Sequence, residues 1–490
     1  MAILYIYILL FLFALLYSKA ALFWLYLWQL KEYRLDRFLS EFGFLGKLLH
    51  FWVFSGGRKF HRPVFTVKAF LIYIASLLIV LEGIYLVLKG YFYGDSFGFW
   101  FIIIGLLALY FLVPLVVVAT MFLFQVPIWT AKFLIYKMAA ARVSANKNLV
   151  VIGITGSYGK TSTKEFLAQI LERKFKVKKT PKNINTEIGV SKFILSNLAV
   201  AQKDSSPASG RAQNDRESVL IAEMGAYKKG EIKRLCDIAK PRIGIITGIN
   251  EQHMDLFKSF ENIIATKYEL IESLPEDGAA FFNGENKYCL EMAEKWQGYK
   301  TIYGGTNRPP LSSHPYQGGE VGGLPSHYLQ NLAGAIEVAR YLGMDEDEIT
   351  GAVKNIKLSE RMTQTFIGKN GALIIDDTYS ANPAGVLAAL DYLAEQKQNY
   401  KIIIMPCLIE LGEAAEDVHR RIGKRINEVC NLAVITTKDC FDIMEQEAGE
   451  KVVLATLPQK AIELLKDKLN SDAAVLIEGR VAQGIVNFLK

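Results

Sequence analysis

A glycine-rich turn that ends in Lys-Thr, "GITGSYGKTSTKEF" at 153–166, has the composition of a phosphate-binding loop. In the general P-loop, G-x-x-x-x-G-K-S/T, backbone N–H groups surround the phosphates, the lysine reaches the β and γ oxygens, and the hydroxyl binds Mg²⁺. Ile154 stands where that pattern has its first glycine, and the glycines are Gly153 and Gly156 instead. A helix behind the loop still supplies N–H groups to an anion. The residues expected to contact a nucleotide here are Gly156, Ser157, Tyr158, Gly159, Lys160, Thr161 and Ser162.

The elements around this loop support a nucleotide site. "NLVVIGITG" (148–156) predicts a buried strand, and "TSTKEFLAQILERKF" (161–175) has helical periodicity, so the glycine turn joins a strand to a helix. Helical patterns separate most of the further apolar runs. Such alternation predicts the α/β class, with parallel sheets covered by helices. The further predicted strands are 218–224, 242–249, 372–379, 401–408, 432–437 and 473–479.

Several stretches, in order along the chain, resemble the Mur ligase family. "GITGSYGKTSTKE" is similar to the ATP loop of that family, G-x-T-G-x-x-G-K-T/S. Its Ser157 and its Thr-Ser-Thr-Lys-Glu continuation most resemble the branch that adds D-alanyl-D-alanine to UDP-N-acetylmuramoyl-tripeptide. The other similar segments are "TPKNINTEIG" (180–189), "AEMGAYKKGEI" (222–232), "PRIGIITGINEQHMDLFKSFENIIATKYEL" (241–270), "HYLQNLAGA" (327–335), "IIDDTYSANP" (374–383) and "ELGEAAEDVH" (410–419).

The resemblance implies two soluble domains and a reaction. It implies a central P-loop ATPase domain over 146–357 and a Rossmann-like C-terminal domain over 358–490, with ATP and Mg²⁺ as cofactors. In the family, ATP activates a carboxylate as an acyl phosphate, and an amine then attacks it to form an amide. Such a reaction requires charge neutralisation on the phosphoryl group and an oriented amine.

The resemblance also implies roles for individual residues. Lys160, His253 and Lys267 are the expected catalytic residues, with Lys267 matching a lysine that the family carries as a carbamate. Metal ligation is expected from Thr161, Glu223, His253 and Lys267. Adenine, phosphate and ribose contacts are expected from His327, Asn331, Arg361 and Asp377.

The first 145 residues have a different character. Apolar runs at 3–30, 64–89 and 97–127 are each long enough to cross the roughly 30 Å apolar core of a bilayer. Basic residues are frequent in 31–63 and after 130, but the short connection near 94–95 has none. The positive-inside rule therefore predicts about three transmembrane helices in the cytoplasmic membrane, with the ligase domains on the cytosolic side.

The sequence departs from the family in three places: before residue 145, between Tyr303 and His327, where the stretch is short for this branch, and at two motifs of the C-terminal domain. No segment before residue 145 resembles the family's UDP-binding domain. Pro406-Cys407-Leu408 replaces the family's G-D-M, and Glu478-Gly479-Arg480 replaces its K-G-S. We therefore expect a membrane-tethered Mur-type ligase of peptidoglycan synthesis, whose precursor is UDP-linked or lipid-linked and whose second substrate is an amino acid or dipeptide. Two alternatives remain open, a ligase for another envelope or polyglutamate-like polymer and a non-catalytic membrane scaffold.

The net charge and the cysteines limit which other classes of protein this sequence can belong to. The net charge of +7 does not indicate nucleic-acid binding, because many basic residues flank the apolar runs and no zinc-finger or RNA-binding motif occurs. The five cysteines show neither C-x-x-C pairs nor metal-ligand spacing, so we expect reduced, structural cysteines in a cytosolic domain. They are Cys236, Cys289, Cys407, Cys430 and Cys440.

Overall fold

The computed structural model of the protein divides into two compact units, residues 1–134 and residues 135–490. It describes residues 2–31, 33, 38, 63–93, 99–198, 217–304, 326–358, 363–378 and 381–490. Each unit has its own hydrophobic core, so the two are considered separately.

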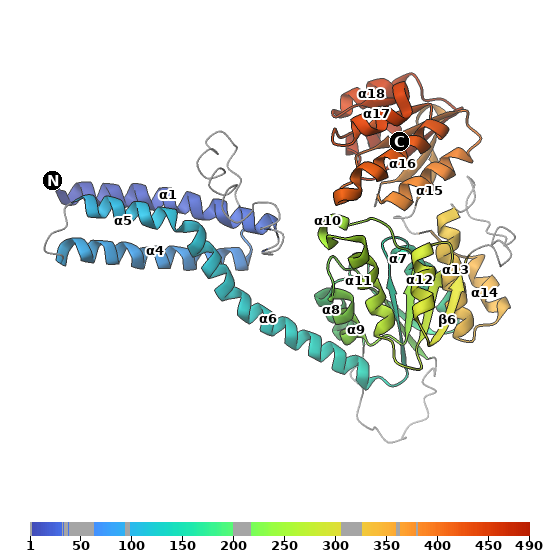
Figure 1. The fold of residues 1–490 in the computed structure, drawn as a ribbon, viewed down its shortest axis with the longest axis horizontal. Helices are drawn as coiled ribbons and strands as arrows, with labels where there is room; N and C mark the ends of the chain where they lie inside the picture. Colours follow the sequence, from blue (N-terminus) through green and yellow to red (C-terminus); the bar gives the residue numbers. More distant parts are fainter. Residues whose placement is uncertain are drawn as a thin grey trace. The chain divides into compact units, whose positions relative to one another are not determined.

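The first unit is a set of apolar helices. Helices α1 (Ala2–Leu30), α4 (Val67–Tyr93) and α5 (Trp100–Phe111) lie side by side (Figure 1). The fourth helix, α6 (Val113–Ala145), begins in this unit and ends in the next. The hydroxyl of Tyr17 in α1 donates to the carbonyl oxygen of Ser76 in α4 at 3.1 Å, and Ser18 and Tyr73 share a second hydrogen bond between the same helices, which satisfies their polar groups.

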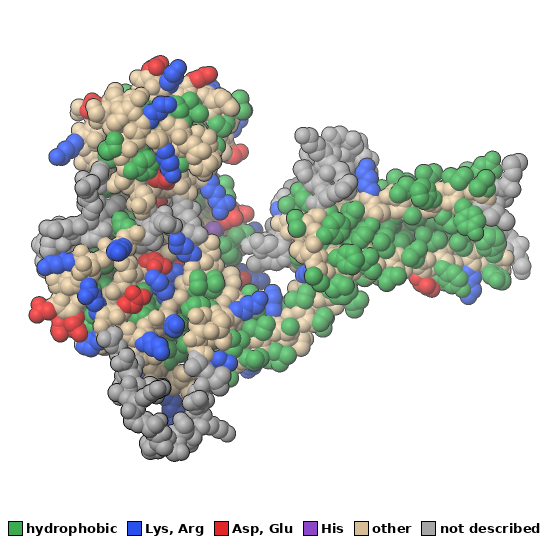
Figure 2. Space-filling model, turned by 180° about the vertical axis from the view of Figure 1, so that it is seen from behind, with side chains coloured by type: hydrophobic (Ala, Val, Ile, Leu, Met, Phe, Trp, Pro, Cys, Tyr) green, Lys and Arg blue, Asp and Glu red, His purple; other side chains and the backbone are tan. Residues whose placement is uncertain are grey.

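Three of these helices are long and apolar enough to cross a membrane, namely 4–30, 67–93 and 113–145. Hydrophobic side chains cover the face of this unit shown in Figure 2, where charged side chains are few. The predicted single run over 97–127 is wrong in its extent, because the chain breaks at Leu112 and α6 continues to Ala145. Pro114 marks the break, since a proline is favoured in the first turn of a helix, whereas Pro127 lies inside α6 without ending it.

The middle part of the chain forms a parallel six-stranded sheet in the order β2-β3-β1-β4-β5-β6. Its strands are β1 (Leu149–Thr155), β2 (Lys176–Lys179), β3 (Ser218–Glu223), β4 (Ile243–Ile246), β5 (Ala279–Asn283) and β6 (Tyr299–Tyr303). Both faces are covered, so side chains of alternating direction along β1 enter two different cores: Ile152 and Ile154 enter one and Val151 the other.

Two groups of helices cover this sheet. The Ile152 face packs against α7 (Lys160–Leu171), α13 (Ser326–Tyr341) and α14 (Glu346–Val353). The Val151 face packs against α8 (Glu187–Asn197), α9 (Glu231–Ala239), α11 (Phe260–Glu272) and α12 (Lys287–Lys295). The last turns of α6 join the second group, where Ala139 and Val143 are buried and Arg142 Nη1 donates to Leu198 O at 2.8 Å.

The C-terminal part forms a second six-stranded sheet, in the order β11-β10-β9-β12-β8-β7. Its strands are β7 (Gln364–Ile367), β8 (Leu373–Asp377), β9 (Tyr400–Met405), β10 (Leu432–Ile435), β11 (Val452–Leu454) and β12 (Ala473–Glu478). All pairs are parallel except β7 with β8. One face packs against α15 (Pro383–Ala394), α16 (Ala415–Val429) and α17 (Phe441–Ala448), the other against α18 (Pro458–Lys466) and α19 (Gln483–Leu489).

The predicted α/β class with parallel sheets is confirmed, and each of the seven predicted strands is present. Five strands were not predicted: β2, β5, β6, β7 and β11. They are three to five residues long, too short for an apolar pattern to stand out. The domain boundaries at 145 and 357 stay predictions.

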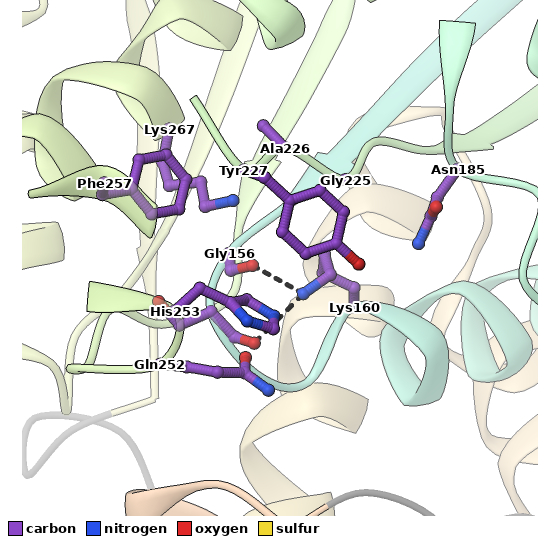
Figure 3. A pocket seen from close by; sticks show the side chains of 11 residues that line it. Gly156, Lys160, Asn185, Gly225, Ala226, Tyr227, Gln252, His253, Phe257 and Lys267 are labelled. Atoms are coloured by element: carbon purple, nitrogen blue, oxygen red, sulfur yellow. Dashed lines mark hydrogen bonds between the residues drawn. The ribbon is translucent and has the colours of Figure 1, made fainter. Parts of the chain in front are cut away.

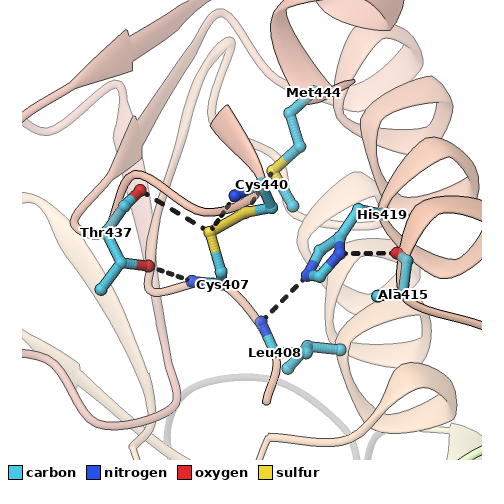
Figure 4. Close-up of a disulfide and its surroundings, with 7 residues drawn as sticks. All are labelled: Cys407, Leu408, Ala415, His419, Thr437, Cys440 and Met444. Atoms are coloured by element: carbon cyan, nitrogen blue, oxygen red, sulfur yellow. Dashed lines mark hydrogen bonds between the residues drawn. A yellow bond between two sulfur atoms is a disulfide. The ribbon is translucent and has the colours of Figure 1, made fainter. Parts of the chain in front are cut away.

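The prediction of five reduced cysteines is wrong for two of them. Cys407 and Cys440 form a disulfide with a Cα–Cα distance of 5.6 Å, although 33 residues separate them (Figure 4). The fold brings them together because Cys407 follows β9 and Cys440 follows β10, and these strands are neighbours in a parallel sheet. The other three cysteines, Cys236, Cys289 and Cys430, are buried thiols as expected.

Candidate active site

The glycine-rich loop lies at the carboxyl edge of the middle sheet, between β1 and α7. Glu223 ends the neighbouring strand β3, and the segment from Thr247 to His253 follows β4 on the other side of β1. Ligands of open parallel sheets bind in the crevice outside this edge. The sheet order therefore brings the loop, Glu223 and His253 to one place.

Gly156 is required by both its backbone angle and its surroundings. Its φ is 154°, and a Cβ atom there would lie 2.2 Å from Thr247 Oγ1. The neighbouring backbone is also close, since the same Cβ would lie 3.0 Å from Gly248 O, which accepts from Ser157 N at 2.7 Å. A larger residue would push the loop away from the segment that follows β4, so the glycine fixes the shape of the loop.

Gly159 begins helix α7 and has a φ of 78°. A Cβ atom there would lie 2.4 Å from Oδ1 of Asn331, a buried residue of α13. The amide of Asn331 therefore lies directly against the loop. An amide offers both a donor and an acceptor, which suits the edge of a base.

The Lys160 side chain bends back over the loop. Its Nζ donates to Gly156 O at 2.6 Å and to Ser157 O at 3.1 Å. Burial lowers the pKa of Lys160, and the charge of Glu223 opposes that shift. The ammonium therefore lies where the loop curves, at the point from which a P-loop lysine reaches phosphate oxygens.

Glu223 is the centre of a buried polar cluster. Its Oε2 accepts from Lys164 Nζ at 3.0 Å and from Thr161 Oγ1 at 3.1 Å, and its Oε1 accepts from Asn185 Nδ2 at 3.4 Å. The side chain of Lys164 is fully buried and that of Glu223 is 6% exposed. Burial opposes ionisation of Glu223, but attraction to Lys164 and Lys160 outweighs it and lowers the pKa of this carboxyl.

One pocket joins Lys160 and the loop to Lys267 and His253 (Figure 3). Gly156, Ser157 and Lys160 line it on the loop side. The opposite walls come from Asn185, Gly225, Ala226, Tyr227, Gln252, His253, Phe257 and Lys267. The pocket therefore combines a phosphate-type loop, two lysines and a histidine.

Lys267 lies in α11 and is buried, with Nζ 5.5 Å from the ring centroid of Phe257. Burial lowers the pKa of Lys267 to about 7, and repulsion from Lys160 adds to the shift. A large part of this side chain is consequently a neutral amine near pH 7, the form that reacts as a nucleophile.

His253 begins the short helix α10 (Met254–Phe257), and its φ of 62° lies in the left-handed region. Its ring meets Tyr227 edge-on, with centroids 4.9 Å apart. Its Nδ1 forms a short contact with Oε2 of Glu410, a residue of the C-terminal domain. Two further pairs join the domains here, Asn250 Nδ2 to Asn382 Oδ1 at 2.8 Å and Arg421 Nη2 to Glu251 Oε1 at 2.7 Å.

Comparison with known proteins matches both soluble domains. The description "Mur ligase middle domain" matches residues 154–312, and "Mur ligase, glutamate ligase domain" matches residues 360–481. The chain belongs to the Mur ligase family.

Two curated relatives and one solved structure illustrate the similarity. The UDP-N-acetylmuramoyl-tripeptide--D-alanyl-D-alanine ligase of Synechocystis sp. is 30% identical over 310 residues, covering 59% of this chain and 62% of that protein. The ligase of the same name from Bacillus subtilis is 29% identical over 293 residues, covering 56% and 60%. The chain thus spans about three fifths of these relatives. The structure of MurF from Thermotoga maritima in complex with ADP has a TM-score of 0.59 at 23% identity, covering 73% of this chain and 83% of that one, which shows a shared fold.

The Mur ligase fold brings most of the predicted site residues together. Two residues of the loop, Ser157 and Tyr158, instead contact other parts of the protein. The Ser157 N–H is engaged by Gly248 O, and the Tyr158 ring packs on Gly248 with its hydroxyl accepting from Asn286 at 3.3 Å. Ser162 lies in the first turn of α7. Around the pocket itself, the structure places Gly156, Lys160, Thr161, Glu223, His253 and Lys267.

The remaining predicted nucleotide contacts lie toward the C-terminal domain. Asp377 ends β8, and burial raises its pKa to about 6. Its charge also acts on Tyr328 in α13, the helix that carries Asn331, so Asp377 lies near that helix. Arg361 and the side chain of His327 lie outside the described residues.

Sequence reasoning missed five residues that the structure brings to the site: Asn185, Tyr227 and Gln252 on the pocket wall, Lys164 beside Glu223, and Glu410 beside His253. Each lies within a segment that resembles the family. The types of these five residues did not by themselves mark them as functional. Lys164, for example, lies one turn into a helix, where a lysine is ordinarily a surface residue.

The glycine loop leads to a direct test. Gly156→Ala introduces a Cβ beside Thr247 Oγ1 at an unfavourable φ, with a strain of about 1–3 kcal/mol. We expect the substitution to weaken binding of a fluorescent ATP analogue by about tenfold or more. Gly351→Ala is the control, because nothing lies within 4 Å of its added Cβ. Equal dissociation constants for the two variants would contradict this view of the loop.

Proposed function

We propose that this chain is a membrane-tethered, ATP-dependent amide ligase of the Mur type. The observation that carries the proposal is the single pocket shared by Lys160, His253 and Lys267, with the Thr161–Glu223 pair at its side. These side chains come from four separate elements of the middle domain, so their convergence is a property of the fold. The proposed reaction joins the carboxylate of a cell-wall precursor to the amine of an amino acid or dipeptide.

The donors around Glu223 suit a magnesium ion. Mg²⁺ prefers oxygen ligands, and the Thr161 hydroxyl and Glu223 carboxylate lie 3.1 Å apart beside the loop. In the proposed assignment these two oxygens hold one Mg²⁺, and His253 and a carbamate on Lys267 hold another. The metal ions supply charge neutralisation for phosphoryl transfer.

The chain's own residues supply the rest of the proposed mechanism. Lys160 stabilises charge on the γ-phosphoryl group of ATP as the precursor carboxylate attacks its phosphorus, the bond to the bridging oxygen breaks, ADP leaves and an acyl phosphate forms. The amine then attacks the acyl carbon, and phosphate leaves as the amide forms. Asn331 faces the adenine and Asp377 the ribose in this assignment, because Asn331 lies against Gly159 and Asp377 lies near the same helix.

The relatives' name indicates a substrate pair. We propose D-alanyl-D-alanine, or a similar amine, as the acceptor and a muramoyl tripeptide as the carboxylate. The helices before residue 134 favour a lipid-linked precursor as a second candidate beside a UDP-linked one, because they would hold the pocket near a bilayer. A scaffold without catalysis is disfavoured, because it would have no use for Lys160 over a phosphate-type loop with Thr161 and Glu223 beside it.

The ligase assignment is tested by product formation. Full-length protein in detergent is given ATP, D-alanyl-D-alanine and either UDP-linked or lipid-linked muramoyl tripeptide, and phosphate release and amide mass are measured. We expect Lys160→Ala to lower turnover by about 100-fold or more, since it removes a charge from the transferring phosphoryl group. Lys174→Ala is the matched control, because that lysine forms a surface ion pair with Glu348. No amide with either precursor would refute the substrate assignment, and full activity of Lys160→Ala would refute the ATP site.

The carbamate on Lys267 predicts a pH dependence. Only the neutral amine attacks CO₂, and with a pKa of about 7 its fraction rises as the pH rises. At fixed dissolved CO₂, the initial rate at which carbamate forms, measured by timed trapping with an oxonium alkylating reagent, should increase roughly tenfold from pH 6 to pH 8. Mass spectrometry of the trapped peptides measures it, with the exposed Lys258 as internal control. No adduct on Lys267 at pH 8 would contradict the assignment.

The tether is proposed from three helices of 27, 27 and 33 residues, whose outward apolar side chains would otherwise face water. We place the ligase domains on the cytosolic side, where ATP is present. Full-length protein should remain in the membrane pellet after an alkaline carbonate wash, and external protease should leave residues 135–490 intact in spheroplasts. Release by carbonate, or cleavage from outside, would contradict this placement.

A further inference from the structure

A single loop connects the disulfide to the pocket. The loop from Pro406 to Ala414 leaves β9, and only two residues stand between Cys407 and Glu410. Cys407 is bonded to Cys440, and its N–H donates to Thr437 Oγ1 at 2.7 Å. The next residue is also held, because Leu408 N donates to His419 Nε2 at 3.0 Å (Figure 4).

The other end of this loop lies on the middle domain. Glu410 Oε2 contacts His253 Nδ1, and Glu410 O accepts from Asp255 N at 3.2 Å. Gly412 packs against the same aspartate, since a Cβ on it would lie 3.2 Å from the Asp255 Cα. Ile409 between the two anchor points is 78% exposed, so packing of its side chain does not hold the loop. The loop is therefore held at two points, by the disulfide at one end and by the contact with His253 at the other.

The contact with Nδ1 has a chemical consequence. A carboxylate on one imidazole nitrogen fixes the tautomer and the ring orientation, and leaves Nε2 for a ligand. His253 lines the pocket, and Glu410 therefore orients a side chain to which the proposed function assigns metal ligation. Glu410 is a positioning residue, because it acts through His253.

The place of the disulfide is unusual for a stable cross-link. An ATP-dependent site belongs in the cytosol, where disulfides are rare and are mostly transient or redox-sensing. Cys407 is one of the three residues, Pro406-Cys407-Leu408, that stand in place of the family's G-D-M. The cross-link therefore occurs where the sequence differs from the family. Both cysteines are buried, and Cys407 is the more exposed residue of the two, at 6% against 1% for Cys440.

We propose that the Cys407–Cys440 disulfide is a reversible redox element that positions Glu410 on His253, so that the oxidised enzyme is the more active form. This proposal rests on the proposed function for its effect on activity. Its effect on the loop is independent of that function.

The redox step balances with a dithiol reductant of the thioredoxin class. A reductant thiolate attacks Cys407 Sγ, the Cys407–Cys440 bond breaks, and Cys440 leaves as a thiolate and takes up a proton. The second reductant thiol then releases Cys407, which is protonated in turn, and the reductant ends as a disulfide. Two electrons and two protons pass to the protein, and a dithiol oxidant of the same class reverses the step.

The first measurement needs no substrate. Full-length protein in detergent is poised in oxidised and reduced dithiothreitol mixtures, its disulfide content is read by alkylation and mass spectrometry, and hydrogen exchange is followed over 406–412. We expect faster exchange in this segment after reduction and in Cys440→Ser, but not in Cys430→Ala, which removes a buried free thiol. Equal exchange in the two redox states would overturn the proposal.

The second measurement uses the ligase assay. Glu410→Ala should lower kcat/KM about tenfold, and Glu410→Gln should lose less because its amide oxygen still accepts from Nδ1–H. Reduction of the native enzyme should cost less than Glu410→Ala, and Glu410→Ala itself should respond to reduction no further. Glu413→Ala, on the exposed part of the same loop, is the control.

The outcomes separate the two proposals. Equal activity of oxidised and reduced enzyme, or an undiminished redox response in Glu410→Ala, would overturn the redox role. Absence of any ligase activity together with redox-dependent exchange over 406–412 would refute the proposed function and leave the loop mechanism supported.

Discussion

The active-site region depends on one buried ion pair, between Lys164 and Glu223. Lys164 is fully buried and lies 3.0 Å from a carboxylate that is itself nearly buried, so neither charge is tolerated there without the other. The pair joins the first turn of α7 to the end of β3. Because the glycine loop spans the gap between β1 and that same turn, its two ends are fixed by the sheet and by this pair. The ion pair thereby also sets the positions of Lys160 and Thr161, because both belong to the helical turn that Lys164 holds.

Positive charges outnumber negative charges around the pocket. Lys160 and Lys267 face the same space, and Glu223 is the carboxylate whose charge reaches Lys160. Burial together with repulsion from Lys160 lowers the pKa of Lys267, so the fold itself reduces the positive charge there. A site built in this way favours an anionic substrate at the loop and leaves a reactive amine at the opposite wall. Both properties suit phosphoryl transfer with a modified lysine, and neither follows from any one residue.

Local patterns predicted the loop, the α/β class and seven strands, because β-branched runs and a glycine turn are properties of neighbouring residues. They did not predict what depends on the order of the sheets. Cys407 and Cys440 are far apart in sequence and meet because β9 and β10 pair in parallel. Glu410 meets His253 across 157 residues and two domains. The break at Leu112 escaped hydropathy because residues on both sides are equally apolar, and only Pro114 distinguishes the position.

The departures from the family lie together on the C-terminal domain. Cys407 follows β9, and Glu478 ends the adjacent strand β12, where the family has lysine. Glu478 is fully buried, and among the described residues no group hydrogen-bonds to either of its carboxylate oxygens. Burial and the nearby Asp377 raise its pKa well above the usual range, which favours the protonated form. The segments of the middle domain that resemble the family include the glycine loop and Glu223, whereas the carboxyl edge of the second sheet carries a buried glutamate and a cross-linked loop at the motifs that differ. The same edge carries Glu410 and Asn382, which contact the middle domain and lie in segments that resemble the family, so changed and retained residues stand side by side there.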